Sequence, residues 1–378
     1  ESMSLRAGAK NFSPEEMSEG IEFAHKRGCK VYVTANILAH NEDLAEAERY
    51  FRELREIRPD AILVADPGMF SLAKEICPDI DLHISTQANN TNYRTFRFWE
   101  KMGATRVVSA RELSLEEIRE IRSKIGDSLE IESFVHGAMC ISYSGRCLLS
   151  NYFTGHDANH GECKHPCRWK YAVSEVSRPG VYLPIEENDR GTFIFNSKDL
   201  CMLEYIPELI AAGVNSLKIE GRMKTALYVA ATARTYRKAL DDYYESEEKY
   251  RENIPWYLEE IKKCTTRDFC TGFWFGKPDY ESQIYSNNTY STEYTYIGSV
   301  AEVNDQAEAI FSQKNKFSRG EKIEIMKTDG RNIEARVLSI RTDETPDMPS
   351  APHPKQKLYV RFSETPEVYD ILRRREEL

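Results

Sequence analysis

Four of the chain's nine cysteines fall within one stretch, residues 132–171. They are Cys140, Cys147, Cys163 and Cys167, with the spacings C-x6-C, C-x15-C and C-x3-C. Deprotonated thiols bind soft metals such as iron and zinc. Structural zinc sites usually take cysteines from tight C-x2-C pairs, whereas the ligands of an iron–sulfur cluster come from loops of varied length. The spacing therefore favours an iron–sulfur cluster.

Basic side chains lie close to these cysteines in sequence. A cluster held by four thiolates carries surplus negative charge, which nearby cations offset. Two other interpretations stay open at this point, namely a zinc site and four unconnected cysteines that pack as small apolar residues. The nearby basic residues are Arg146, Lys164, His165, Arg168 and Lys170.

Bulk composition narrows the class of protein. The 378 residues carry a formal net charge of –10, which argues against coating nucleic acid by charge alone but allows a local basic face. No run of about eighteen apolar residues is present, so we expect no membrane span. An odd number of cysteines without obvious pairing predicts a reducing, cytoplasmic location. The first residues read as a loop that leaves an earlier element, which predicts a natural start upstream.

Strand-like runs alternate with amphipathic helical stretches through the first two thirds of the chain. Six strands separated by helices imply parallel pairing, and a closed βα barrel needs eight. We therefore predict a TIM-like βα barrel over residues 1–280 whose first two strands are absent from this chain. The alternative is an open doubly wound sheet, but no G-x-G-x-x-G follows any strand. The predicted strands are Lys30–Asn36, Ala61–Asp66, Asp81–Ala88, Arg106–Ala110, Ile131–Gly137 and Ser216–Gly221.

Polar residues follow these strands, and in βα barrels the chemistry lies at the carboxyl ends of the strands. We predict catalytic roles for Arg111, His136, Glu220 and Arg222. The two arginines could clamp carboxylates or phosphates through paired hydrogen bonds. Each of these side chains could instead cap a strand or lie in solvent. The other polar strand-end residues are Asn36, His40, Asp66, Gln87, Asn89 and Glu112.

Two further regions complete the predicted organisation. Residues 173–200 read as an inserted hairpin, followed by Cys201 at the start of a helix. Residues 285–378 show short strands separated by turn signals, which predicts a small antiparallel β-barrel domain. One hairpin there carries cations that could touch phosphates or form an ordinary solvated loop. These cations are Lys314, Lys316, Arg319, Lys322 and Lys327.

Several blocks of the sequence resemble a known family. The string ESFVHGAMCISYSGRCLLS at 132–150 resembles the signature of the collagenase-like peptidase family (unclassified peptidase family 32), and GECKHPCRWKY, NSKDL and SLKIEGR are similar to its further blocks. The resemblance is strongest to the tRNA hydroxylation branch. It implies a βα barrel with a small β-barrel, a 4Fe-4S cluster on the four cysteines, and prephenate as a co-substrate. Some relatives use a cysteine near Cys201 in place of Cys167.

Three classes of function follow. The first is an iron–sulfur enzyme that hydroxylates the wobble uridine of tRNA at C5, with prephenate as the donor. The second is a peptidase, as the family name implies. The sequence has no G-x-S-x-G or H-E-x-x-H motif, but His136 with Cys140 could form a nucleophile–base pair. The third is a non-enzymatic RNA-binding factor with a structural cluster.

Overall fold

The computed structural model of the chain divides into two compact units. Unit 1 comprises residues 1–222 and 268–288, and unit 2 comprises residues 223–267 and 289–378. The predicted cluster ligands Cys140 and Cys167 and the predicted catalytic Arg222 lie outside the described residues. The structure describes residues 3, 12–139, 147–156, 163–164, 166, 187–188, 191–192, 198–221, 224–264, 268–276 and 294–376.

Unit 1 is built around a sheet of parallel strands. Each strand in the series pairs in parallel register with the next, and apolar residues fill much of the central strands. A mixed α/β fold with a parallel-strand sheet is therefore confirmed. In order across the sheet the strands are β1 (Tyr32–Ala35), β2 (Ala61–Val64), β3 (Asp81–Ile84), β4 (Arg106–Val108), β5 (Glu130–Gly137) and β9 (Ser216–Ile219).

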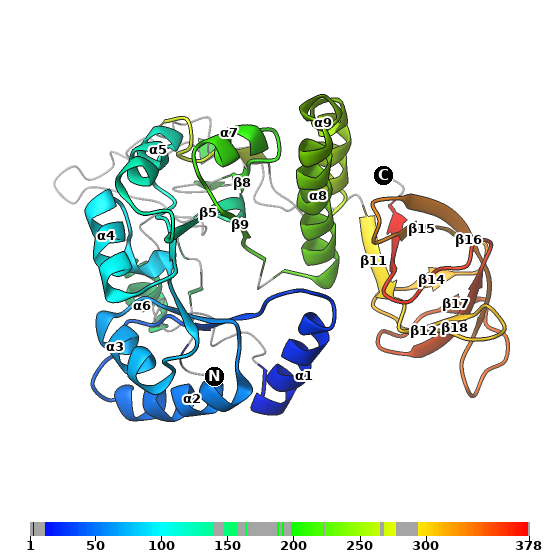
Figure 1. Cartoon of the computed structure of the whole chain (residues 1–378). Helices are drawn as coiled ribbons and strands as arrows, with labels where there is room; N and C mark the ends of the chain where they lie inside the picture. The colour runs from blue at the N-terminus through cyan, green and yellow to red at the C-terminus, as the bar shows by residue number, and fades with distance from the viewer. Residues whose placement is uncertain are drawn as a thin grey trace, which may run out of the picture. The chain divides into compact units, whose positions relative to one another are not determined.

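Helices connect these strands and lie around the sheet (Figure 1). Their starts follow from local chemistry. Ser114 and Glu117 form the reciprocal capping box that the sequence predicts, and Asp66 caps the helix after β2. Helix α2 buries Phe51 and Leu54 on one stripe. The helices are α1 (Pro14–His25), α2 (Leu44–Ile57), α3 (Pro67–Ile76), α4 (Tyr93–Met102), α5 (Leu115–Lys124) and α7 (Ile206–Ala211).

Closure of this sheet into a barrel stays a prediction, because no pairing joins β1 to β9 within the described ranges. An unexpected strand occupies the end of β5 instead. Strand β8 (Asp199–Cys201) pairs antiparallel with β5 and parallel with β10 (Phe269–Cys270). The predicted helix start at Cys201 is therefore wrong, since backbone pairing with β5 holds this residue extended. The short ladder of β6 (Glu187–Asn188) and β7 (Gly191–Thr192) falls inside the predicted hairpin.

Unit 2 contains an antiparallel sheet with two long helices. The separate antiparallel domain is confirmed, and its closure as a small barrel stays a prediction. An apolar core of fifteen buried residues fills it. The sheet order is β11 (Tyr294–Ser299), β19 (Ile371–Arg375), β15 (Lys322–Met326), β16 (Asn332–Arg341), β18 (Lys357–Phe362), β13 (Ala309–Ser312) and β12 (Glu302–Val303), with a second ladder of β14 (Phe317–Ser318) and β17 (Ser350–Ala351).

Helices α8 (Ala226–Glu245) and α9 (Glu247–Lys262) lie side by side (Figure 1). Leu227 and Ala231 of α8 share a buried cluster with Met326 and Ile371 of the sheet. By contacts these helices therefore group with the sheet, although they precede residue 280 in the chain. The predicted domain boundary at residues 280–285 stays a prediction. No helix in the described part of the chain has the length and hydropathy needed to cross a membrane.

A buried ionic cluster fixes the two helices to the sheet. Glu260 of α9 is 1% exposed and lies 2.5 Å from the fully buried guanidinium of Arg373 on β19. Arg234 of α8 also pairs with Glu260 and donates to the carbonyl oxygen of Lys327 at 2.8 Å. Burial alone would raise the pKa of Glu260, but Arg373 and Arg234 lower it. The carboxylate is therefore charged at neutral pH, and its two guanidinium partners come from different elements.

Candidate active site at the strand ends

One face of the parallel sheet carries charged side chains in place of an apolar layer. Glu132 on β5 is 5% exposed. Its Oε1 lies 2.5 Å from the ammonium of Lys218 on β9, and its Oε2 lies 3.0 Å from Nη1 of Arg106 on β4. The hydroxyl of Ser216 donates to Oε2 at 3.0 Å. Burial opposes ionisation, but Lys218 and Arg106 hold the pKa of Glu132 below its ordinary value.

The same face continues toward β1 through an aromatic contact. The ring of Tyr32 lies 4.8 Å from His83, edge to face, and the guanidinium carbon of Arg106 lies 5.0 Å from the Tyr32 ring. Burial and the positive charge of Arg106 lower the pKa of His83 to about 4. The imidazole is therefore neutral at physiological pH. The neutral rings of Tyr32 and His83 thus border the charged residues of β4, β5 and β9.

Phe134 is the next residue along β5 on this face, closer to the carboxyl end. The guanidinium carbon of Arg111 lies 3.9 Å from the centre of its ring, and the ammonium of Lys218 lies 5.7 Å away. The guanidinium of Arg111 is therefore held against an aromatic surface. Burial raises the pKa of the adjacent Glu112, although Arg111 opposes this effect. Two cations beside one aromatic ring form a suitable place for an anionic group.

Three of the four predicted catalytic residues lie at the ends of neighbouring strands. Arg111 follows β4, His136 lies near the end of β5, and Glu220 follows β9. The backbone N–H of Glu220 donates to the carbonyl of His136 at 2.9 Å, so these two residues are brought together. Gly137 has φ +112°, and a Cβ there would lie 2.6 Å from the Glu220 carbonyl oxygen, so this close approach requires glycine. Their catalytic roles stay predictions.

The cysteine segment is described in part. Cys147 and Cys163 are both half-buried. Cys147 precedes α6 (Leu149–Thr154), and the backbone N–H of Lys164 donates to the hydroxyl of the fully buried Ser150 on that helix at 3.1 Å. This bond ties the segment of Cys163 to the start of the helix that follows Cys147. Cys201 is buried on β8 and pairs through its backbone with His136.

The segments that carry two of the predicted ligands are thus tied to one short helix, an arrangement open to a centre held by several thiolates. Within the described ranges no three metal-binding side chains lie together. The two remaining predicted ligands, Cys140 and Cys167, fall outside those ranges. The donor set is therefore compatible with an iron–sulfur cluster as far as it is described.

Both parts of the sequence match known family models. Residues 1–284 match the model of peptidase family U32, and residues 292–373 match that of the peptidase family U32 C-terminal domain. The chain belongs to peptidase family U32. The resemblance expected from the cysteine blocks is therefore confirmed.

Among curated relatives of this U32 chain, a Bacillus subtilis (strain 168) protein named tRNA hydroxylation protein P1 is 39% identical over 97% of this chain and 85% of the relative. The tRNA hydroxylation protein P of Escherichia coli (strain K12) is 37% identical over 92% of this chain and 84% of the relative. A 23S rRNA 5-hydroxycytidine synthase of the same organism is 36% identical over 61% of this chain and 33% of its own length.

Sequence reasoning missed the charged centre of the U32 sheet. Glu132, Arg106 and Lys218 lie within the predicted strands, whereas the prediction considered only the residues at the strand ends. A signal was present, because Arg106 opens a short apolar run, Glu132 follows Ile131 and Lys218 lies between Leu217 and Ile219. A buried charge in a strand requires a partner, so these residues indicate that opposite charges meet, without showing which strands bring them together.

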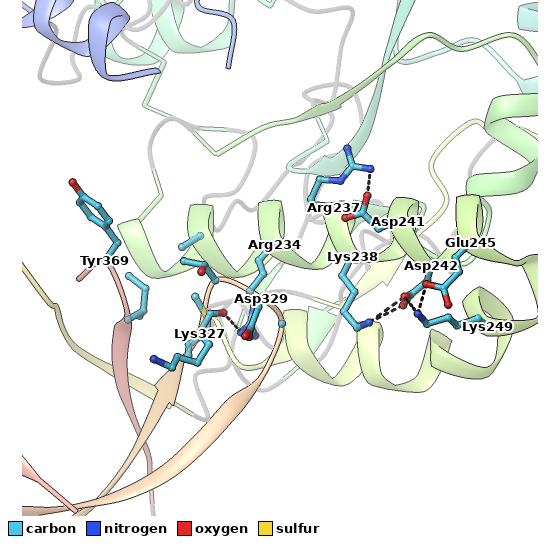
Figure 2. A pocket seen from close by; sticks show the side chains of 15 residues that line it. Arg234, Arg237, Lys238, Asp241, Asp242, Glu245, Lys249, Lys327, Asp329 and Tyr369 are labelled. Atoms are coloured by element: carbon cyan, nitrogen blue, oxygen red, sulfur yellow. Dashed lines mark hydrogen bonds and ion pairs between the residues drawn. The ribbon is translucent and has the colours of Figure 1, made fainter. Parts of the chain in front are cut away.

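Unit 2 of the U32 chain contains a cavity of about 430 Å³ between α8, α9 and the turn after β15 (Figure 2). Its charges are largely compensated. Lys238 and Lys249 both face Asp242 (Figure 2). Their ammonium groups lie 2.9 Å and 3.3 Å from its carboxylate, and Arg237 pairs with Asp241 at 2.5 Å. Of these ion pairs, that of Lys249 with Asp242 couples α9 to α8. We assign no ligand to the cavity.

Proposed function

We propose that this chain is an RNA-modifying enzyme that hydroxylates C5 of the wobble uridine of tRNA. The observation that carries the proposal is the 39% identity over 97% of the chain to a relative named tRNA hydroxylation protein P1. The rRNA relative named as a 5-hydroxycytidine synthase supports the same chemistry, attachment of a hydroxyl group to C5 of a pyrimidine. The proposal includes a cytoplasmic enzyme whose parallel sheet belongs to a βα barrel.

The cofactor in this proposal is a 4Fe-4S cluster. Cys140, Cys147, Cys163 and Cys167 would hold it, with Cys201 as the alternative fourth ligand. The bound cluster would supply one-electron chemistry to the hydroxylation. Support comes from the bond between Lys164 and Ser150, which ties the segment of Cys163 to the helix that follows Cys147, and from the half-buried state of both cysteines.

The strand-end residues would bind and orient the substrates. Arg111, held against Phe134, and Lys218 would bind a carboxylate of the small acidic co-substrate, which we propose is prephenate. Glu132 would hold the ammonium of Lys218 in place. His136 and Glu220 would move protons at the reacting base, and Arg222 would bind a second anionic group.

The test is nucleoside mass spectrometry of tRNA from a strain that lacks the gene. We expect the 5-hydroxyuridine derivatives to disappear and to return with the wild-type gene. Cys163→Ser should fail to restore them, whereas Cys29→Ser, which changes an exposed cysteine outside the segment, should restore them fully. Unchanged nucleosides in the deletion strain would refute the proposed function.

The family description also suggests a peptidase. His136 with Cys140 would supply the nucleophile and base. Purified protein incubated with gelatin and casein tests this alternative, and release of peptides that Cys140→Ser abolishes and Cys163→Ser preserves would favour it. Loss of tRNA modification in both variants would instead favour the hydroxylase.

A further inference from the structure

Strand β18 presents a basic outer face. Its residues alternate, so Leu358, Val360 and Phe362 are buried in the core of unit 2 while Lys357 and Arg361 are exposed. Tyr359 lies between these two cations on the same face and is half-buried. Lys357 and Arg361 are four residues apart along a strand, so their attachment points are separated by roughly 13 Å.

A neighbouring strand holds the central ring in place. The guanidinium carbon of Arg341 on β16 lies 4.1 Å from the centre of the Tyr359 ring, and the ammonium of Lys357 lies 5.2 Å from it. Arg341 also binds both carboxylate oxygens of Glu308, at 2.8 Å and 2.6 Å. Glu308 is therefore neutralised, and the ring has a fixed orientation between two cations.

Two loops at the start of β18 add further cations. The backbone N–H of Gln313 donates to the carbonyl of Gln356 at 3.0 Å, and that of Lys355 donates to the carbonyl of Gln313 at 2.7 Å. The side chain of Gln313 is fully buried and donates to the carbonyl of Ala351. The exposed Lys314 and Lys355 are thereby held on adjacent loops, beside Lys357.

The cations of this face differ in ion pairing from three cations of the predicted hairpin. Among the described residues, no carboxylate lies within 4 Å of the charged groups of Lys314, Lys355, Lys357 or Arg361; Glu302 and Asp343 act on Lys357 only from farther away. By contrast, three cations of the predicted hairpin are occupied. Arg319 pairs with Asp347, Lys322 with Glu334, and the buried Lys327 with Asp370.

We propose that this β18 face, consisting of Lys314, Lys355, Lys357, Tyr359 and Arg361, binds the phosphate backbone of the RNA substrate. The inference rests on the proposed function and names the surface that docks the tRNA. Cations without an ion pair among the described residues suit phosphates, and the fixed Tyr359 ring offers a surface for a ribose or base. The outer positions of β18 carry no exposed aliphatic side chain for insertion into a membrane.

The test compares two triple variants with the same loss of charge. The first is Lys314→Gln/Lys355→Gln/Lys357→Gln, and the control is Lys101→Gln/Lys124→Gln/Lys262→Gln, which changes exposed lysines on α4, α5 and α9. Fluorescence anisotropy measures the binding of unmodified tRNA across a series of KCl concentrations, and circular dichroism checks the fold. Each lost phosphate contact should reduce the slope of log K against log salt by about 0.7–0.9.

We expect the first variant to bind tRNA about tenfold or more weakly at low salt, with a slope smaller by roughly two. The control should bind like wild type, and a triple Lys→Arg variant at the same positions should retain binding. Wild-type binding by the first variant, an equal loss in the control, or a preference of wild type for anionic vesicles over tRNA would overturn the inference.

Nucleoside analysis keeps this inference separate from the proposed function. Normal modification in the deletion strain, together with weakened RNA binding by the first variant, would refute the hydroxylase and retain the RNA surface. Loss of modification in the deletion strain, together with wild-type binding by the first variant, would retain the hydroxylase and refute the surface.

Discussion

Glu132 is the residue on which the charged face of unit 1 depends. It is buried and shared by Lys218 and Arg106, so its removal leaves two cations without their common anion. We predict that Glu132→Gln lowers the free energy of unfolding by about 3–5 kcal/mol at neutral pH. Glu130→Gln is the matched control. It removes a partner of Arg106 that is 46% exposed, and should cost less than about 1 kcal/mol in urea unfolding.

The effect of Glu132→Gln should depend on pH. The pKa of Glu132 is lowered in the folded chain, so its contribution is complete above the unfolded pKa and is lost as the pH falls through the folded value. The difference between wild type and variant should therefore shrink on the acid side of about pH 4. A difference that stays constant down to pH 3 would show that packing, not charge, is responsible.

His83 should respond to pH in a different window. The unfolded chain binds a proton at this residue below its ordinary pKa of 6.5, and the folded chain only below about 4. We therefore predict that His83 lowers the free energy of unfolding as the pH falls from 6.5 to 4, by about 3 kcal/mol in total. NMR titration of the imidazole, assigned with His83→Gln, measures the pKa. A value above 6 would contradict the buried, neutral state.

At the residue scale the sequence predicts the strand-end positions better than the interior ones. The rule that chemistry follows strand ends led to Arg111, His136 and Glu220, which the structure places on neighbouring strands. Glu132 was missed because the partners of a buried charge come from strands distant in sequence. The register between β4, β5 and β9 determines that Glu132 meets Arg106 and Lys218. A single sequence does not specify that register.

At the scale of the elements, helices and strands with a clear local sequence pattern are predicted well. The parallel strands of unit 1 are short apolar runs, and helix starts such as Ser114 carry their capping chemistry in adjacent residues. Strand β19 (Ile371–Arg375) was missed because three arginines follow two apolar residues. Arg373 is fully buried nonetheless, since Glu260 and Glu324 neutralise it. Ion pairs with residues distant in sequence thus allow an arginine-rich segment to form a buried strand, which the local sequence does not indicate.

The same ionic cluster gives a prediction about α8 and α9. Glu260 of α9 joins Arg234 of α8 to Arg373 of β19, so Glu260→Gln leaves two buried guanidiniums that share no anion at this point. We expect the free energy of unfolding of the sheet–helix unit to fall by about 3–5 kcal/mol. Glu259→Gln changes the exposed neighbour and should stay within about 0.5 kcal/mol. Equal urea midpoints for the two variants would contradict a structural role for the cluster.

At the scale of the whole molecule, the two compact units do not follow the order of the chain. Residues 268–288 return to unit 1 after α8 and α9 have joined unit 2. Short strands and turn signals over residues 285–378 indicated a second domain, but helical periodicity does not say which sheet a helix covers. The buried contacts of Leu227 and Ala231 with Met326 decide this assignment, and they are separated by almost one hundred positions.

The two buried carboxylates test this division, because each lies with its partners inside one unit. Glu132 binds across β4, β5 and β9, and Glu260 binds across α8, α9 and β19. Local opening follows local contacts, so hydrogen exchange should report each substitution where it acts. We predict faster exchange of the β5 and β9 amides in Glu132→Gln, and of the α8 and β19 amides in Glu260→Gln. Mass spectrometry of peptic fragments resolves these segments. If Glu260→Gln accelerates exchange in β5 as much as in α8, the two units do not open separately and the division by contacts is wrong.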